Sequence, residues 1–200
     1  IVKDQIGITY DKPMWHVDRM HPSRFGYHVL ARHFADLLAA DGHAVCLPTD
    51  ASQRFQLSAD QVREHWGQAT RGVLLASPSN PTGTSVAFEV LTNIHRFVSA
   101  QGGFTLVDEI YLGLSFDSSY GQTALNHGDD IISINSFSKY FNMTGWRLGW
   151  LVVPDGLVDV MERLTQNLYI CASAVAQHAA LACFEPSSLA LYEERRAAFK

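Results

Sequence analysis

Cysteine is scarce in this sequence and is not arranged for disulfides or for zinc. The three cysteines, Cys46, Cys171 and Cys183, are odd in number and widely spaced, and none belongs to a Cys-x-x-Cys pair. The pattern therefore indicates neither a disulfide-stabilised fold nor a zinc knuckle. Unpaired cysteines are typical of a reducing compartment, so this usage favours a cytoplasmic protein.

Positive charge is also in short supply. Lys and Arg total 15 against 20 for Asp and Glu, which gives a net charge of −5, and the basic residues are scattered along the chain. We therefore expect neither a nucleic acid nor an anionic membrane as a partner. No apolar run approaches the length of a membrane span, and the first residues lack the charged-then-apolar order of a secretory signal.

Metal-binding and nucleotide-binding patterns are missing as well. Nine histidines are present, but the pairs His16 and His21, and His28 and His33, lack the i, i+4 spacing that puts two ligands on one helix face. No metal site is predicted. There is also no Gly-x-Gly-x-x-Gly and no Gly-Lys-Ser/Thr sequence, so these two kinds of nucleotide site have no support.

The sequence does contain the alternation of an α/β domain. Hydrophobic residues make up 47% of the 200, enough to bury one substantial core. Residues 1–27 have no clean period and stay unplaced, whereas residues 28–200 read as one domain with a largely parallel sheet. Apolar runs predict strands at 44–47, 72–76, 104–107, 131–134 and 148–153; helical patterns fall at 30–42, 58–66 and 86–100, and in much of the chain beyond 153.

Polar residues follow three of these predicted strands directly. In open parallel sheets the binding crevice lies at the carboxyl ends of the strands, so these residues are the ones to examine. They are an amide, a carboxylate and a phenol (Asn80, Asp108 and Tyr111), followed by a hydroxyl, an amine and a guanidinium (Ser136, Lys139 and Arg147). This set suits pyridoxal 5′-phosphate (PLP), which needs an amine for a Schiff base, an acid beside its ring nitrogen and groups that bind phosphate.

At these positions the sequence resembles the class I and II aminotransferases, which are PLP enzymes of fold type I. Segment 79–84 reads Ser-Asn-Pro-Thr-Gly-Thr and is similar to the family's Asn-Pro-Thr-Gly turn. Segment 107–111, Val-Asp-Glu-Ile-Tyr, resembles its Asp-Glu-x-Tyr strand end. Segments 136–139, Ser-Phe-Ser-Lys, and 143–149, Met-Thr-Gly-Trp-Arg-Leu-Gly, are similar to its lysine region. The order and intervals also match, over roughly residues 44–185.

The resemblance implies a three-layer α/β/α large domain and a role for each residue. Lys139 would form the Schiff base and move a proton between substrate Cα and the cofactor. Asp108 would keep the ring nitrogen protonated. Asn80 and Tyr111 would hydrogen-bond the cofactor's phenolic oxygen. Ser136 and Arg147 would bind its phosphate.

Structural alternatives exist for every one of these residues. Asp108 and Asn80 also suit turns, and Ser136 suits a turn serine. Tyr111 suits a packed aromatic, and Arg147 a salt bridge. A lysine is usually a solvated surface residue, but the chain has only four: Lys3, Lys12, Lys139 and Lys200.

The activity implied is transfer of an amino group between an L-amino acid and a 2-oxo acid, by a homodimer. Another fold type I reaction, such as a C–S lyase or synthase, and a non-catalytic PLP-binding regulatory module are the alternatives. The pattern Ser136-x-x-Lys139 also occurs in penicillin-binding proteins, but no Lys-Thr-Gly follows it.

The sequence departs from the family in several places. No counterpart is found for the substrate-carboxylate arginine of the small domain, or for the Gly/Ser/Ala phosphate turn before residue 44. His21 stands near the expected place of the ring-stacking aromatic residue, and Asn142 replaces a small residue. We therefore expect either a truncated gene product or a domain cut from a longer chain, with an incomplete small domain and impaired activity.

Overall fold

The computed structural model of the chain describes residues 44–200, and residues 47–200 form one compact unit. The helix predicted at 30–42 and the unplaced segment 1–27 lie outside the described residues. Four strands build one sheet in the order β1-β2-β3-β4: β1 (Gly72–Ala76), β2 (Phe104–Asp108), β3 (Ile131–Ser136) and β4 (Gly149–Val152). The first three are parallel and β4 is antiparallel to β3, which confirms an α/β domain with a mostly parallel sheet.

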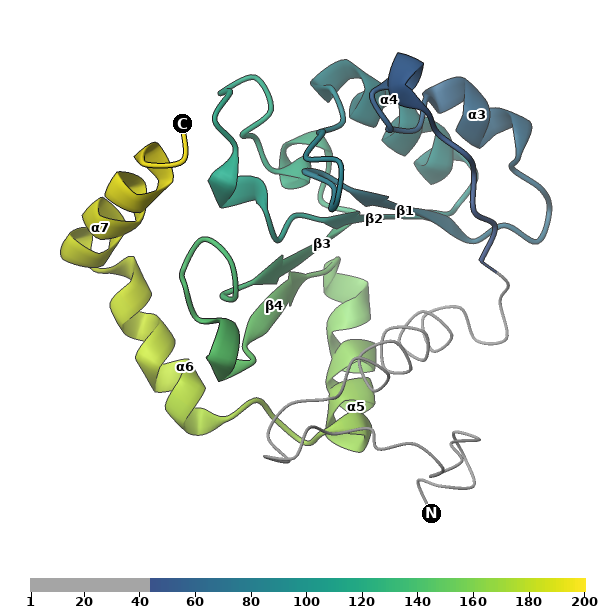
Figure 1. The fold of residues 1–200 in the computed structure, drawn as a ribbon. Coiled ribbons are helices and arrows are strands. Elements are labelled where there is room, and N and C mark those ends of the chain that lie inside the picture. Colours follow the sequence, from purple (N-terminus) through teal and green to yellow (C-terminus); the bar gives the residue numbers. More distant parts are fainter. Residues whose placement is uncertain (1–43) are drawn as a thin grey trace, which may run out of the picture. The chain divides into compact units, whose positions relative to one another are not determined.

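Two helices, α3 (Ala59–Glu64) and α4 (Phe88–Ala100), lie on one side of β1 and β2 (Figure 1). In α4, Leu91, Ile94 and Val98 recur at helical spacing and are buried against Leu75 of β1 and Val107 of β2. Burial of each aliphatic side chain stabilises the fold by about 1.5–3 kcal/mol. These side chains belong to the main hydrophobic core of the unit. On the opposite side of the sheet, Leu74 and Phe104 are exposed among the described residues.

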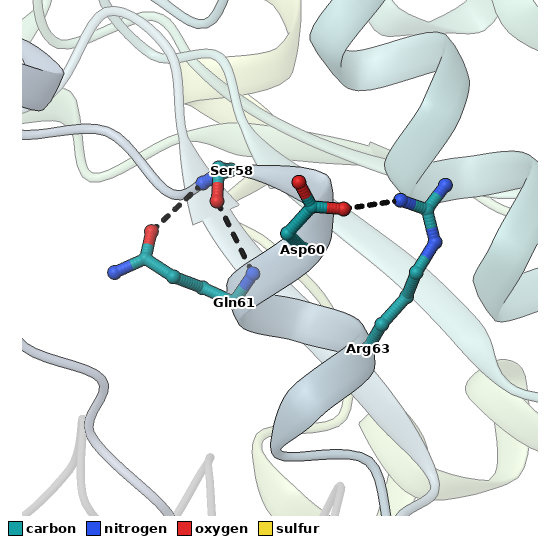
Figure 2. Close-up of polar contacts among 4 residues, drawn as sticks. All are labelled: Ser58, Asp60, Gln61 and Arg63. Atoms are coloured by element: carbon teal, nitrogen blue, oxygen red, sulfur yellow. Dashed lines mark hydrogen bonds and ion pairs between the residues drawn. The ribbon is translucent and has the colours of Figure 1, made fainter.

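The start of α3 follows the predicted capping box. Gln61 N donates to Ser58 Oγ at 3.1 Å, and Ser58 N donates to Gln61 Oε1 at 3.0 Å (Figure 2). Arg63 pairs with Asp60 at 2.6 Å on the exposed surface of the same helix. The helix ends at Glu64, two residues before the predicted end at about residue 66, and the side chain of His65 contacts the carbonyl of Gln61 at 2.9 Å.

The C-terminal part is helical, as the pattern predicts. It holds α5 (Val158–Leu168), α6 (Ala174–Leu181) and α7 (Pro186–Ala197). Ala176 and Ala180 of α6, with Cys183, pack on Phe137, Met143 and Leu148 to form a second, smaller hydrophobic cluster. The segment between β3 and β4 is therefore fixed from the side of α6.

Two predicted elements need correction. Residues 44–47 are not a strand: they carry no regular secondary structure, Val45 is 74% exposed, and no strand of the described part pairs with them. An apolar run without a neighbouring strand cannot satisfy its backbone, and Pro48 removes a donor directly after it. Helix α4 begins at Phe88 rather than 86, because Val86 N donates to Ser77 Oγ at 3.1 Å and Ala87 is extended.

Candidate active site

The carboxyl ends of β1, β2 and β3 meet at one edge of the sheet. Ala76 is level with Asp108 across the β1–β2 pair, and Asp108 is level with Ile134 across the next pair. The parallel register therefore brings the loop after residue 76, the end of β2 and the end of β3 together. Five of the six predicted site residues, all but Arg147, lie at these ends or just beyond them, as the sequence predicts.

Asn80, Tyr111 and Lys139 come together from three separate segments. Asn80 Nδ2 donates to the Tyr111 hydroxyl at 3.2 Å. Lys139 Nζ lies 5.4 Å from the centroid of the Tyr111 ring, within range of a cation–π contact. Lys139 and Tyr111 are both half-buried. The predicted amine, phenol and amide thus form one connected group.

Asp108 is the last residue of β2 and is half-buried. Its Oδ1 accepts a hydrogen bond from Ile110 N at 3.1 Å, which is the turn contact named above as an alternative role. Burial raises the pKa of this carboxyl above its usual 3.8; the Ile110 N–H opposes the shift, and the charge of Glu109 adds to it. A carboxylate in this position is only partly solvated, so a cation placed opposite it would be stabilised.

The loop that carries Lys139 is closed by its own hydrogen bonds. Ser138 N donates to Ser136 Oγ at 3.0 Å, and Thr144 Oγ1 donates to the carbonyl of Ser138 at 2.6 Å. Across the base of the loop, Phe137 N donates to Leu148 O at 3.1 Å. These bonds hold the backbone on both sides of Lys139. The hydroxyl of Ser136 here performs the turn role that was its structural alternative.

Arg147 closes the same loop. It lies two residues before Gly149, which pairs with Ser136 across β3 and β4. Its backbone is left-handed, with φ of 52°, a conformation that costs a non-glycine residue about 1–2 kcal/mol. The guanidinium is exposed and its Nη1 donates to Thr144 O at 2.9 Å. Backbone strain of this kind is common where a side chain has to point at a ligand.

The departure at Asn142 has a structural reason. This residue has φ of 57°, and asparagine is the residue that tolerates the left-handed region best after glycine. Its replacement of a small residue therefore preserves the turn between Lys139 and Met143.

An open pocket of about 510 Å³ adjoins Asn80 and Tyr111. It is lined by residues between 78 and 85, by residues between 111 and 120, and by Arg54. The Arg54 guanidinium lies 4.8 Å from the centroid of the Tyr120 ring and donates to the Tyr120 hydroxyl. Sequence reasoning missed Arg54, since no motif marks it. Asp108, Ser136, Lys139 and Arg147 do not line this pocket.

A second missed residue is Glu109, which is only 3% exposed. The sequence carried a signal for it, because a charged residue directly after a buried strand needs partners.

Within residues 44–200, no group of three or more His, Cys, Asp or Glu side chains is placed to hold a metal ion. The part of the chain that the structure describes also has no helix long and apolar enough to cross a membrane.

Comparison with known proteins gives consistent matches. The family model described as aminotransferase class I and II matches residues 32–200. The chain is 38% identical over 159 residues to a valine–pyruvate aminotransferase of Mycobacterium tuberculosis, covering 78% of this chain and 41% of that protein. It is 30% identical over 159 residues to an aspartate aminotransferase of Thermotoga maritima, covering 78% and 42%.

A solved structure agrees with the sequence matches. The crystal structure of an aminotransferase from Mycobacterium tuberculosis superposes with a TM-score of 0.75 at 36% identity, over 82% of this chain and 43% of that one. The chain thus spans about two fifths of the length of the relatives it matches.

Proposed function

The chain belongs to the class I and II aminotransferase family, and on that premise we propose that it carries the cofactor-binding part of a PLP-dependent aminotransferase. The reaction would move an amino group between an L-amino acid and a 2-oxo acid. The observation that carries the proposal is the group formed by Lys139, Tyr111 and Asn80 beside Asp108 at one sheet edge. The reported relatives act on different amino acids by name, so the amino acid used by this chain stays open.

The described residues suit PLP in their chemistry. PLP supplies an aldehyde that condenses with an amine and a ring that withdraws electrons from the substrate Cα. Lys139 is the one lysine among the described residues that lies next to the strand ends, and it would bind the cofactor covalently. Its amine would then take and return the proton at substrate Cα. The half-buried Asp108 would keep a proton on the ring nitrogen. The positive charge of that nitrogen would in turn stabilise the partly solvated carboxylate of Asp108.

The remaining residues would orient the ring. Asn80 and Tyr111, already hydrogen-bonded to each other, would share the phenolic oxygen. Arg147 would bind the phosphate with its planar array of donors, and the Ser136 hydroxyl would add a further contact. The 510 Å³ pocket beside Asn80 leaves room for a substrate on the side of Tyr111. The family's usual homodimer is part of the proposal, as is a cytoplasmic location, which the three free cysteines support.

The test is covalent labelling. We expect the folded protein to form a yellow complex with added PLP. Borohydride should fix the cofactor on Lys139 alone, as found by peptide mass spectrometry. Lys139→Ala should abolish the band and the label, whereas Lys200→Ala, at the exposed chain end, is the matched control and should keep both. A well-folded native protein without a label, or with label on other lysines, would contradict the proposal.

A further inference from the structure

Glu109 is a buried carboxylate that the proposed reaction does not use. It follows Asp108, and because successive residues at a strand end point to opposite sides, the two carboxylates face opposite sides of the sheet. Glu109 Oε1 accepts a hydrogen bond from Ala124 N at 2.6 Å. Its Oε2 accepts from Thr123 Oγ1 at 2.9 Å and from Ser133 Oγ at 2.5 Å. Three donors from two other segments thus converge on one side chain.

The backbone of Glu109 is held as firmly as its side chain. Its N–H donates to the carbonyl of Ile134 at 2.8 Å, which continues the pairing of β2 with β3 past Asp108. Its carbonyl accepts from Leu112 N at 2.8 Å, which closes the turn that carries Tyr111. Glu109 therefore stands between the two residues that the proposed site needs from this segment.

A buried charge is a costly way to stabilise a fold. An apolar side chain of similar volume is often at least as stabilising, whereas the loss of one partner from a buried polar group is expensive. The carboxylate instead restricts the conformation of the strand end, because its three hydrogen bonds fix the position and the direction of the backbone there. The fixed strand end includes Asp108 on one side and the Tyr111 turn on the other.

We propose that Glu109 is a positioning residue: its carboxylate anchors the end of β2 to Ala124, Thr123 and Ser133, and so fixes the backbone from which Asp108 and Tyr111 project. The role of Glu109 in a PLP site rests on the function proposed above. The anchoring itself does not depend on any cofactor, so the two ideas can fail separately.

The first experiment uses the protein without PLP. In Glu109→Gln, which keeps the shape but loses the charge and one acceptor, hydrogen exchange at the amides of Leu112 and Ala124 should be faster by about tenfold. The amides of Ile94 and Val98 in α4 serve as internal references and should keep their native rates. The exposed Glu64→Gln is the matched control and should leave all four rates unchanged. Unchanged rates at 112 and 124, or an equal rise in α4, would overturn the anchoring.

A milder variant covers the case in which Glu109→Gln fails to fold. Thr123→Val has nearly the same shape and removes one of the two donors to Glu109 Oε2, together with a contact to Leu125 N; the donor Ser133 Oγ stays in place. We expect the same local change in exchange, by about threefold, since one neutral donor is lost. An exchange rate at Leu112 that stays native in this variant would count against the proposal.

The second experiment uses PLP. If the native protein binds PLP covalently, Glu109→Gln should bind it about tenfold more weakly and the pH titration of the yellow band should shift, because Asp108 and Tyr111 lose their fixed positions. A purely structural role would lower the melting temperature but leave the pH titration of the folded, bound protein unchanged. If the native protein forms no complex, the proposed function fails, and the exchange experiment still decides whether Glu109 anchors the strand.

Discussion

The two sides of the sheet around β2 use polar groups in opposite ways. On the side covered by α4, Glu109, Ser133 and Thr105 are buried, and each is hydrogen-bonded within the protein. On the other side, Asp108 is half-buried with a raised pKa. The polar groups on the covered side have all their partners within the protein and contribute to its stability. The open side holds a polar group that a ligand would satisfy better than the protein does.

The same contrast extends to the backbone. The covered side rests on regular elements, with Ile94 and Val98 of α4 fully buried. The Lys139 loop includes two left-handed residues, Asn142 and Arg147. Left-handed backbone and a partly solvated carboxylate thus occur where the family resemblance assigns chemistry. Left-handed residues also occur outside this region, at Arg54, Phe55 and Ile170. Substitutions of the apolar core residues on the covered side should therefore change stability, and substitutions on the open side should change ligand binding.

The largest effect is expected from Ile94→Ala on the covered side. Its side chain is fully buried, so the truncation should lower the free energy of unfolding by about 2–5 kcal/mol. Urea unfolding measures this loss. Leu74→Ala, at a position 61% exposed on the opposite side of the sheet, is the matched control and should cost under about 1 kcal/mol. Equal losses in the two variants would break the contrast between the sides.

Arg147 should give the next largest effect, on binding rather than on folding. Arg147→Ala should weaken PLP about 10- to 100-fold, since charge-assisted hydrogen bonds to phosphate are lost. Arg147→Lys keeps the charge but not the planar array of donors, and should fall between native and Ala. Absorbance titration with PLP measures both. Native affinity in Arg147→Ala would remove this residue from the site.

Asp108→Asn should give the smallest effect, with a sign that depends on pH and on PLP. Because burial raises the pKa of Asp108 in the fold, the unfolded chain loses this proton at lower pH than the folded protein. The ionised form therefore destabilises the empty fold above the folded pKa, and this penalty disappears as the pH falls below the ordinary value of 3.8.

Thermal melts without PLP should accordingly show Asp108→Asn above the native protein near neutral pH, with the gain lost in acid. Added PLP should reverse the order at neutral pH, because only the carboxylate pairs with a protonated ring nitrogen. Asp60→Asn, on the exposed surface of α3, is the control and should not repeat this reversal. A native protein that is more stable than Asp108→Asn without PLP at neutral pH would contradict the assignment.

Local signals in the sequence predicted most of the described fold. The strand at 72–76 matches β1, and the capping box at Ser58 and Gln61 is present in full. These elements are set by contacts within a few residues, which a sequence displays directly. The strand predicted at 44–47 was wrong. A strand also needs a neighbouring strand to pair with, and an apolar run does not by itself show whether such a partner lies elsewhere in the chain.

The candidate site divides in the same way. The strand-end rule brought out Asn80, Asp108 and Lys139, because polar residues after apolar runs are visible in the sequence. Arg54 became apparent only when the fold brought it beside Tyr120, 66 residues away. The three donors to Glu109 come from positions 14 to 24 residues further along the chain, and no local pattern announces them.

The adjacency of Asp108 and Glu109 makes the length of β2 a sensitive quantity. Removal or addition of one residue within this strand would turn the side chains of its later residues to the other side of the sheet. Glu109 would then face the open side and Asp108 the core. Insertions or deletions in β2 would therefore disturb the core and the predicted site together. We expect changes of chain length to be tolerated in the surface loops rather than in β2.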